Sequence, residues 1–207
     1  MNHDTDRYAE IALTPAAFGL AGRHVVVTGA GRGLGQGIAV SVGLAGATVT
    51  AVARTPAQLD KTAQLIRGRD GECVPHVADI ADLDALPGHV AAINARAPID
   101  GVVHAAGVQI RKPAVDYSVA EWNQVLRVNA QAPFFLSTAI AREQRAAGRP
   151  GSHVFIGSLA STIGLPNGAL YAASKSALLG MARSLSVEMA ALGIRANVVG
   201  PVTFRPS

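Results

Sequence analysis

The sequence HVVVTGAGRGLG, residues 24–35, joins a short apolar run to a turn in which every second residue is glycine. The run at 24–28 is rich in β-branched residues, which is typical of a buried strand. The residues from 34 to 45 have the length and composition of a helix, so the glycines stand between a strand and a helix. Glycine lets a backbone approach a ligand closely, and the N-terminus of the helix carries a partial positive charge. This stretch therefore predicts a strand–turn–helix unit that binds the phosphates of a nucleotide.

The same alternation of short apolar runs and longer helical stretches continues along the chain. The expected strands lie at 24–28, 47–53, 72–78, 99–107 (with its turn), 152–158 and 194–200. The expected helices lie at 34–45, 55–69, 82–96, 118–145 and 168–193. This alternation predicts an α/β fold with a doubly wound, Rossmann-type parallel sheet of six strands and helices on both faces. No repeat or linker interrupts the pattern, so we expect a single domain over residues 1–207.

The glycine turn does not contain the common G-x-G-x-x-G fingerprint of dinucleotide-binding sheets. It fits instead T-G-x-x-x-G-x-G, which begins at Thr28. A flexible loop is the alternative, but the position between the first strand and the first helix favours a nucleotide site. The residues expected to contact the dinucleotide here are Thr28, Gly29, Gly31, Arg32, Gly33, Leu34 and Gly35.

The end of the second strand indicates which dinucleotide is bound. In sheets of this kind an acidic residue at this point binds the ribose of NAD. This chain has Ala53 there, followed by Arg54 and Thr55. An arginine can pair with a 2′-phosphate in fork geometry, and Arg32 in the glycine turn offers a second cation. We therefore expect NADP (NADPH), the alternative being that both arginines are only solvated surface charges.

The composition excludes several other classes of protein. The chain is 49% hydrophobic and 15% charged, and it has no apolar run long enough to span a membrane. Its pI is about 9.7, but the basic residues are scattered and aromatic residues make up only 4%, which argues against a nucleic-acid-binding face. Cys73 is the only cysteine, so neither a disulfide nor a Cys-based zinc site can form within one chain, and no metal is expected. The first residues lack a secretory signal, and we expect a cytoplasmic protein.

The stretch YAASK places Tyr171 and Lys175 four residues apart, where they share one face of a helix. A Tyr-x-x-x-Lys pair downstream of a T-G-x-x-x-G-x-G turn resembles the short-chain dehydrogenase/reductase superfamily. The stretch FGLAGR at 18–23 resembles the family's lead-in to the first strand, so the resemblance covers nearly the whole chain. It implies an NADP(H)-dependent oxidoreductase that interconverts a ketone and a secondary alcohol, with Asn129, Ser158, Tyr171 and Lys175 as catalytic residues.

The four roles that the resemblance implies fit the chemistry of hydride transfer. Tyr171 would be the general acid in reduction and the base in oxidation. Lys175 would be its partner, because a nearby ammonium favours the ionised form of a phenol whose free pKa is about 10. Ser158 would bind the substrate oxygen on which charge develops, and Asn129 would complete a proton relay through water. The nicotinamide carries the hydride chemistry, and the protein supplies position and a proton.

The resemblance implies further cofactor contacts beyond the glycine turn. They are Arg54, Thr55, Asp79, Ile80, Ala105, Ala106, Gly107, Lys175, Pro201 and Thr203. Asp79 would contact adenine, and it is also a candidate cap of the next helix. In HAAG, residues 104–107, His104 and Ala105 replace two asparagines that brace the sheet in relatives. We expect His104 to be a structural strand-end residue rather than a base, and His153 and Cys73 to be packing residues.

The segment VQIRKPAVDYSVAEW at 108–122 indicates the substrate class. It resembles the sugar-acid branch of the family, such as gluconate 5-dehydrogenase and 2-deoxy-gluconate 3-dehydrogenase. This resemblance implies a small polar carbonyl or alcohol substrate, whose carboxylate would meet Arg111 or Lys112. The alternatives are that both residues are exposed loop cations, and that the chain is a 3-oxoacyl-type reductase.

The last residues, ANVVGPVTFRPS at 196–207, resemble the N-x-x-x-P-G segment of the family, with Val202 in place of the glycine. Family members continue with a substrate-covering segment and a seventh strand, so we expect the sixth strand to be a sheet edge. The alternatives for the site are a longer chain, a partner subunit that closes it, and a non-catalytic NADP-binding module. The helices around Asn129 and Tyr171 resemble those that pair in family dimers, and we expect a homodimer, with a tetramer as the alternative.

Overall fold

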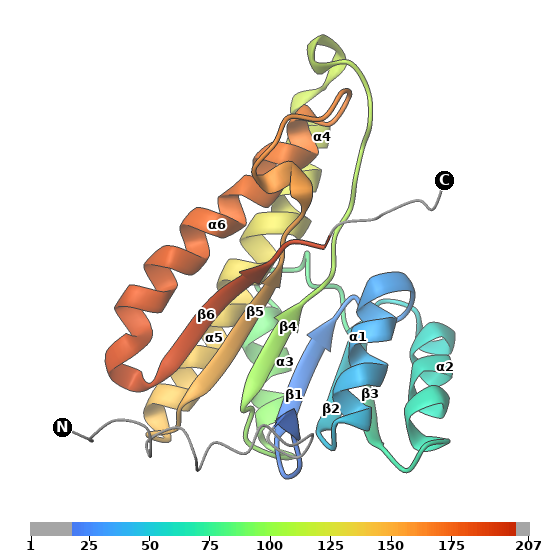
Figure 1. Ribbon diagram of the computed structural model, residues 1–207, viewed down its shortest axis with the longest axis vertical. Coiled ribbons are helices and arrows are strands. Elements are labelled where there is room, and N and C mark those ends of the chain that lie inside the picture. Colours follow the sequence, from blue (N-terminus) through green and yellow to red (C-terminus); the bar gives the residue numbers. More distant parts are fainter. Residues whose placement is uncertain (1–17, 202–207) are drawn as a thin grey trace, which may run out of the picture.

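A parallel sheet of six strands organises the residues that this computed structural model describes, 18–201 (Figure 1). The strands are β1 (His24–Thr28), β2 (Thr48–Ala53), β3 (Glu72–Val77), β4 (Gly101–His104), β5 (Gly151–Ile156) and β6 (Ile194–Val199). Their order across the sheet is β3-β2-β1-β4-β5-β6, and each neighbouring pair is parallel. The doubly wound α/β fold expected from the sequence is confirmed.

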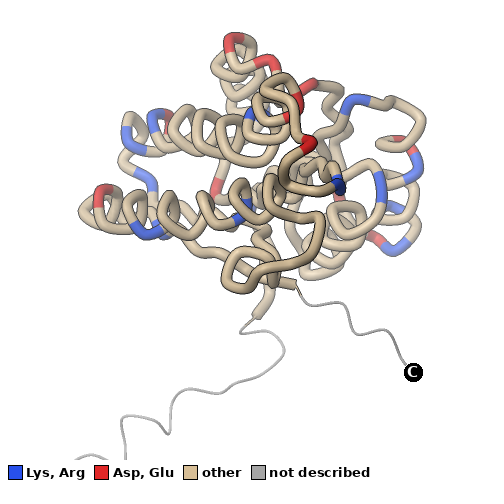
Figure 2. The backbone as a smooth tube through the Cα atoms, turned by 90° about the horizontal axis from the view of Figure 1, so that it is seen from above, with Lys and Arg blue, Asp and Glu red and all other residues tan. Residues whose placement is uncertain are grey.

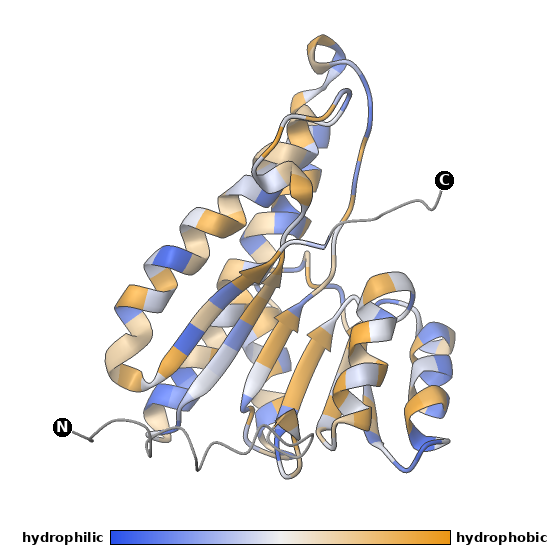
Figure 3. Ribbon diagram, viewed as in Figure 1, coloured by the Kyte–Doolittle hydropathy of each residue, from blue (hydrophilic) through white to orange (hydrophobic). Residues whose placement is uncertain are grey.

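Helices cover both faces of the sheet. On one face lie α1 (Gly33–Leu44) and α2 (Pro56–Arg67), and on the other lie α3 (Leu86–Asn94), α5 (Ala132–Ala146) and α6 (Ala169–Met189). Successive residues of β1 divide between the faces: Val25 and Val27 pack with α1 and α2, and Val26 packs with α3 and α5. Figure 3 shows the resulting pattern, with apolar central strands and polar positions on the outer sides of the helices.

The helix expected at 118–145 is present but is not uniform. It begins at α4 (Val119–Leu126), where Ser118 Oγ accepts from the Glu121 amide at 3.2 Å and forms a capping box with Glu121. It then widens into a π-helical turn, η4 (Arg127–Gln131), before α5. Pro133 explains the change, because a proline cannot donate to the carbonyl four residues back, here that of Asn129.

The segment between β3 and β4 differs from its expected form. The helix predicted at 82–96 is shorter, because α3 begins at Leu86 with Pro87 in its first turn. Asp79 therefore does not cap α3. Its Oδ1 accepts from the Ala81 amide at 3.0 Å and closes a turn ahead of the helix.

The order of the strands creates a switch point between β1 and β4. From β1 the chain builds outward through β2 to β3, and it then crosses to β4 and builds the other way through β5 to β6. The connections that leave β1 and β4 therefore diverge at the carboxyl ends of these strands. In open α/β sheets a ligand binds in the crevice at such a point.

The basic residues are scattered over the structure, as they are along the sequence. Figure 2 shows the Lys and Arg positions on several separate helices and loops rather than along one face. Within residues 18–201, no helix has both the length and the apolarity that a membrane span requires.

Candidate active site

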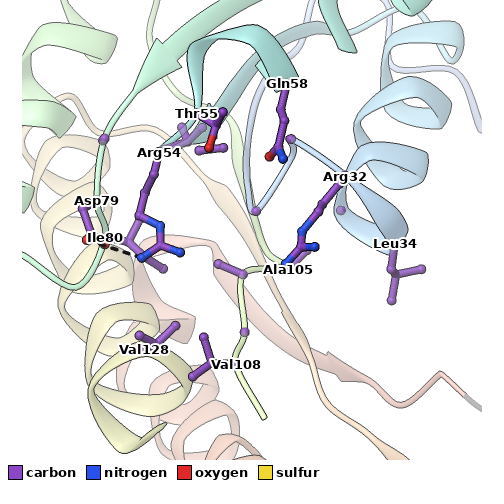
Figure 4. Close-up of a pocket in the computed structure, with 18 residues that line it drawn as sticks. Arg32, Leu34, Arg54, Thr55, Gln58, Asp79, Ile80, Ala105, Val108 and Val128 are labelled. Atoms are coloured by element: carbon purple, nitrogen blue, oxygen red, sulfur yellow. Dashed lines mark ion pairs between the residues drawn. The ribbon is translucent and has the colours of Figure 1, made fainter. Parts of the chain in front are cut away.

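Two adjoining hollows lie along the carboxyl ends of the strands, with volumes of about 500 Å³ and 560 Å³. The first is lined by Gly29, Gly31, Arg32, Leu34, Gly35, Val52, Ala53, Arg54, Thr55, Gln58, Ala78, Asp79, Ile80, Ala105, Ala106, Gly107, Val108 and Val128 (Figure 4). The second is lined by Leu34, Ala105, Gly107, Val108, Gln109, Ile156, Gly157, Ser158, Tyr171, Lys175 and Pro201. Because they share Leu34, Ala105, Gly107 and Val108, the two hollows form one continuous trough.

The glycine turn forms the floor of the first hollow. Gly29 has a φ of +68°, and a Cβ at this position would lie 2.7 Å from the Cα of Ala106. A Cβ on Gly35 would collide with the carbonyl oxygen of Gly29. The helix that follows begins without a capping side chain or an acidic residue in its first turn, so its free amides can bind an anion.

Arg32 and Arg54 both line the first hollow, and Figure 4 shows them on two different sides of it. Arg54 Nη1 is 3.9 Å from Asp79 Oδ2, and both side chains are largely exposed, so this ion pair is weak. Thr55 ends the connection from β2, and Gln58 points into the hollow from the first turn of α2. The structure therefore brings Arg32, Arg54 and Thr55 together around one space, as the sequence predicted.

Lys175 and Tyr171 lie on the wall of the second hollow. The Lys175 ammonium is 5.8 Å from the centre of the Tyr171 ring and donates to the Ile156 carbonyl at 2.7 Å. The lysine side chain is buried, and this burial lowers its pKa to about 8. No carboxylate among residues 18–201 forms an ion pair with Lys175, so the ammonium keeps donors free to face the hollow.

Asn129 lies in the π-helical turn and is buried. Its Oδ1 accepts from the Val108 amide at 2.8 Å, and its Nδ2 donates to the Val108 carbonyl at 2.9 Å and to Ser174 Oγ at 3.0 Å. These bonds join η4 to the segment after β4 and to α6. A Cβ on Gly107 would lie 3.5 Å from Asn129 Oδ1 and 3.6 Å from Lys175 Nζ, so both residues border the floor of the trough.

Ser158 follows β5 and lines the second hollow. Its Oγ accepts from the Ala160 amide at 3.1 Å, which leaves the hydroxyl proton free to donate. Ser161 supports this turn, because its Oγ donates to the Lys175 carbonyl at 3.1 Å and accepts from the Ser158 amide at 3.2 Å. The turn after β5 is thereby fixed to α6.

Most of the predicted cofactor contacts line the trough. Thr28 does not line it, but its Oγ1 accepts from the Ala106 amide at 3.3 Å and so fixes the floor. Gly33 has a φ of +58° at the start of α1 and lies beside the lining residues Arg32 and Leu34. Thr203 falls outside the described residues. Lining residues that were not predicted as site residues are Val52, Ala53, Gln58, Ala78, Val108, Gln109, Val128, Ile156 and Gly157.

The two loop cations differ in their contacts. Lys112 Nζ is 2.6 Å from Glu121 Oε2, and its hydrogen bond is the main cause that lowers the pKa of this carboxyl to about 2. Lys112 is therefore already paired. Arg111 is exposed, and its Nε donates to the side-chain oxygen of Gln109 at 2.9 Å in the amide orientation that satisfies both groups. Since Gln109 lines the second hollow, Arg111 is the one of these two loop cations that contacts a lining residue.

The predicted structural residues are buried. His104 lies at the end of β4, and its Nε2 is 2.9 Å from Ser137 Oγ, so its ring contacts α5 rather than the trough. His153 and Cys73 are also buried in strands. Burial raises the pKa of the Cys73 thiol, so the thiol stays protonated.

Comparison with known proteins agrees with this geometry. The family model "short chain dehydrogenase" matches residues 23–206. L-xylulose reductase from Mesocricetus auratus is 34% identical over 91% of this chain and 75% of its own length. Gluconate 5-dehydrogenase from Gluconobacter oxydans is 32% identical over 92% of this chain and 74% of its own length.

A solved structure of a related enzyme is also similar to this chain. The crystal structure of a gluconate 5-dehydrogenase from Burkholderia cenocepacia, in complex with NADP and tartrate, matches with a TM-score of 0.85 and 30% identity. The match covers 90% of this chain and 73% of that one. The expected resemblance to the gluconate 5-dehydrogenase branch is confirmed. The chain belongs to the short-chain dehydrogenase/reductase family of oxidoreductases.

Proposed function

We propose that this chain is an NADP(H)-dependent enzyme that interconverts a ketone and a secondary alcohol on a sugar or sugar-acid substrate. The observation that carries the proposal is the continuous trough, which has the glycine turn and two arginines at one end and Ser158, Tyr171 and Lys175 at the other. A dinucleotide needs such an extended site, because its phosphates and its reactive ring lie far apart. We propose that the whole chain acts as one dinucleotide-binding and catalytic domain.

The residues of the trough fit a nicotinamide dinucleotide. Gly29 and Gly35 leave room that a side chain would fill, and the uncapped start of α1 offers amides to the pyrophosphate. Arg32 and Arg54 would bind a 2′-phosphate, since the weak pair between Arg54 and Asp79 is easily exchanged for a phosphate contact. Asp79 and Ile80 would lie at adenine, and Pro201 at the nicotinamide end. The bound cofactor would supply the hydride.

The chain's own residues would position the substrate and move one proton. Ser158 Oγ would donate to the substrate oxygen, and the Tyr171 hydroxyl would deliver the proton to that oxygen as negative charge develops on it. Lys175 would stabilise the phenolate that remains, because its charge is buried and forms no ion pair with a carboxylate of residues 18–201. Asn129 would keep η4 and the Val108 segment in place beside Lys175.

The proposed substrate class rests on Arg111 and on the relatives. The names of two relatives describe enzymes of sugars and sugar acids, and the solved relative is in complex with tartrate, a dicarboxylate. We propose that Arg111, beside Gln109, meets a carboxylate or hydroxyl group of the substrate, and that Lys112 does not, because Glu121 occupies it.

We also propose a homodimer formed through α4 and α5. Their exposed large side chains include Trp122, Phe134 and Phe135, and the two phenylalanine rings contact each other edge to face at 5.3 Å. Neighbouring exposed aromatic residues of this kind are typical of an interface. Sedimentation velocity measures the oligomeric state directly.

Cofactor consumption tests the proposed function. The protein is assayed with NADPH and NADH in parallel, against L-xylulose, 5-keto-gluconate and a 3-oxoester. We expect oxidation of NADPH with one of the two sugar substrates. Turnover only with the 3-oxoester would contradict the proposed sugar or sugar-acid substrate. A preference for NADH would contradict the proposed NADP(H) dependence. Tight binding of NADPH without turnover of any substrate would contradict the proposed catalysis and leave a nucleotide-binding module.

A further inference from the structure

Four buried polar side chains form an unbranched chain of hydrogen bonds between α5 and the sheet. His104 Nε2 is 2.9 Å from Ser137 Oγ, which is 2.9 Å from His153 Nδ1. His153 Nε2 is 3.0 Å from Gln144 Oε1, and Gln144 Nε2 donates to the Ile99 carbonyl at 3.0 Å. All four side chains are at most 2% exposed, so water does not compete for these bonds.

The chain of bonds has one direction, because its last member fixes the proton positions. Gln144 donates to Ile99, so its Oε1 must accept, and His153 must carry a proton on Nε2. A neutral His153 then accepts at Nδ1 from the hydroxyl of Ser137. Ser137 has no second proton, so it accepts from His104, which carries its own proton on Nε2. Each donor thus has one acceptor.

Both histidines are neutral in this arrangement. Burial lowers the pKa of His153 to about 4, and burial together with His153 holds the pKa of His104 well below the ordinary value. The network therefore keeps the same tautomers across neutral pH.

His104 also stands directly before the floor of the trough. Its ring stacks on Phe155 at 4.7 Å, with 14° between the planes, so the side chain is held from two sides. The next residues, 105–107, border both hollows. Ala106 lies so close to Gly29 that an added Cβ would be 2.7 Å away, and there is little room for this segment to shift toward the glycine turn.

We propose that His104 is a positioning residue for cofactor binding: through Ser137 and His153 it fixes the carboxyl end of β4, and with it residues 105–107 against the glycine turn. The inference rests on the proposed nucleotide-binding function. The imidazole braces this segment from the side of α5.

Two substitutions at this position separate the hydrogen bond from packing. His104→Phe keeps a ring against Phe155 but cannot donate to Ser137. His104→Gln places an amide N–H close to the position of the imidazole Nε2 and restores the donor. His24→Phe is the matched control, because His24 is also buried, lies at the amino end of β1, and is bonded to the Ala97 carbonyl at 2.9 Å and to Thr50 Oγ1 at 2.8 Å.

The experiment measures NADPH affinity by fluorescence titration, and hydrogen exchange in peptides that span residues 103–109. We expect His104→Phe to weaken NADPH binding about tenfold, the cost of a small misplacement of a binding segment, and to speed exchange in these peptides. His104→Gln should stay close to the wild type in both measurements. His24→Phe should lower the melting temperature without either effect.

Equal behaviour of His104→Phe and His24→Phe in both measurements would reduce His104 to a packing residue and overturn the proposal. Failure of His104→Gln to restore both would overturn the role of the hydrogen bond. If the wild-type protein bound neither NADPH nor NADH, the proposed function would fail instead, and the exchange rates of residues 105–107 would still decide whether His104 fixes this segment.

Discussion

Replacing Lys175 by methionine should reduce turnover strongly while making the response of stability to pH flatter. The ammonium lies 5.8 Å from the centre of the Tyr171 ring. If this distance is taken as the separation of the charges, the attraction between an ammonium and a phenolate is about 3 kcal/mol at an effective dielectric constant of about 20. If the phenolate forms in the transition state, removal of the ammonium should lower kcat about 100-fold.

The same substitution tests the energetics of burial. The pKa of Lys175 is lowered by burial to about 8 in the folded chain, whereas its ordinary value is 10.5. The unfolded chain therefore binds more protons between these two values, and the wild-type protein gains stability as the pH rises through this window. The full penalty below pH 8 is about 3 kcal/mol, of which about 2–3 kcal/mol disappears between pH 7 and pH 10. Lys175→Met has no such gain.

Urea unfolding, followed by far-ultraviolet circular dichroism at pH 7 and at pH 10, measures this difference. Relative to that of Lys175→Met, the free energy of unfolding of the wild type should rise by about 2–3 kcal/mol from pH 7 to pH 10. Lys61→Met, at an exposed lysine of α2, is the control and should show no relative change. A constant difference between wild type and Lys175→Met from pH 7 to pH 10 would refute the idea that the structure buries this ammonium at a cost. Turnover within a few-fold of the wild type would refute its role beside Tyr171.

Three further substitutions test the other parts of the trough. Tyr171→Phe should lower kcat by at least about 100-fold, because it removes the proposed proton donor, and should leave the dissociation constant of NADPH within about twofold; unchanged turnover would exclude Tyr171 as the acid. Arg54→Asp should weaken NADPH by about 10- to 100-fold and favour NADH, because it exchanges a phosphate partner for a repelling charge; parallel titrations that show the same preference before and after would remove Arg54 from the argument. Asn129→Ala should lower the free energy of unfolding by about 1–3 kcal/mol, since it removes the side-chain partner of the half-buried Val108 amide and carbonyl and one hydrogen bond of the buried Ser174 hydroxyl; urea unfolding that matches the wild type would contradict this.

The fold could be predicted from the sequence because its signals are local. The glycines at 29–35 and the β-branched strands each dictate their own conformation, and the alternation of strands and helices then leaves one class of sheet. The boundaries that differ have a local cause as well. Pro87 starts α3 late, and Pro133 accompanies the π-helical turn, although hydrophobic periodicity does not reveal such a turn.

The candidate site could be predicted only in part, because some of its residues share no motif. Gln58 and Val128 reach the trough by their place on a helix face, which sequence spacing alone does not connect to the glycine turn. The network of His104 was missed for the same reason. Its one visible signal is the pair Ser137 and Gln144, two polar residues seven positions apart on a face of α5 that is otherwise apolar.

The switch point between β1 and β4 places the residues for cofactor choice and the residues for substrate choice in different halves of the chain. Residues proposed to discriminate between cofactors, such as Arg32 and Arg54, precede β4, and those proposed to act on the substrate, such as Ser158 and Tyr171, follow it. Substitutions at well-separated positions combine nearly additively. A recombination event in the connection between α3 and β4 would therefore exchange one choice and keep the other, so new pairings of reductant and substrate could arise by shuffling gene halves rather than by redesigning a site.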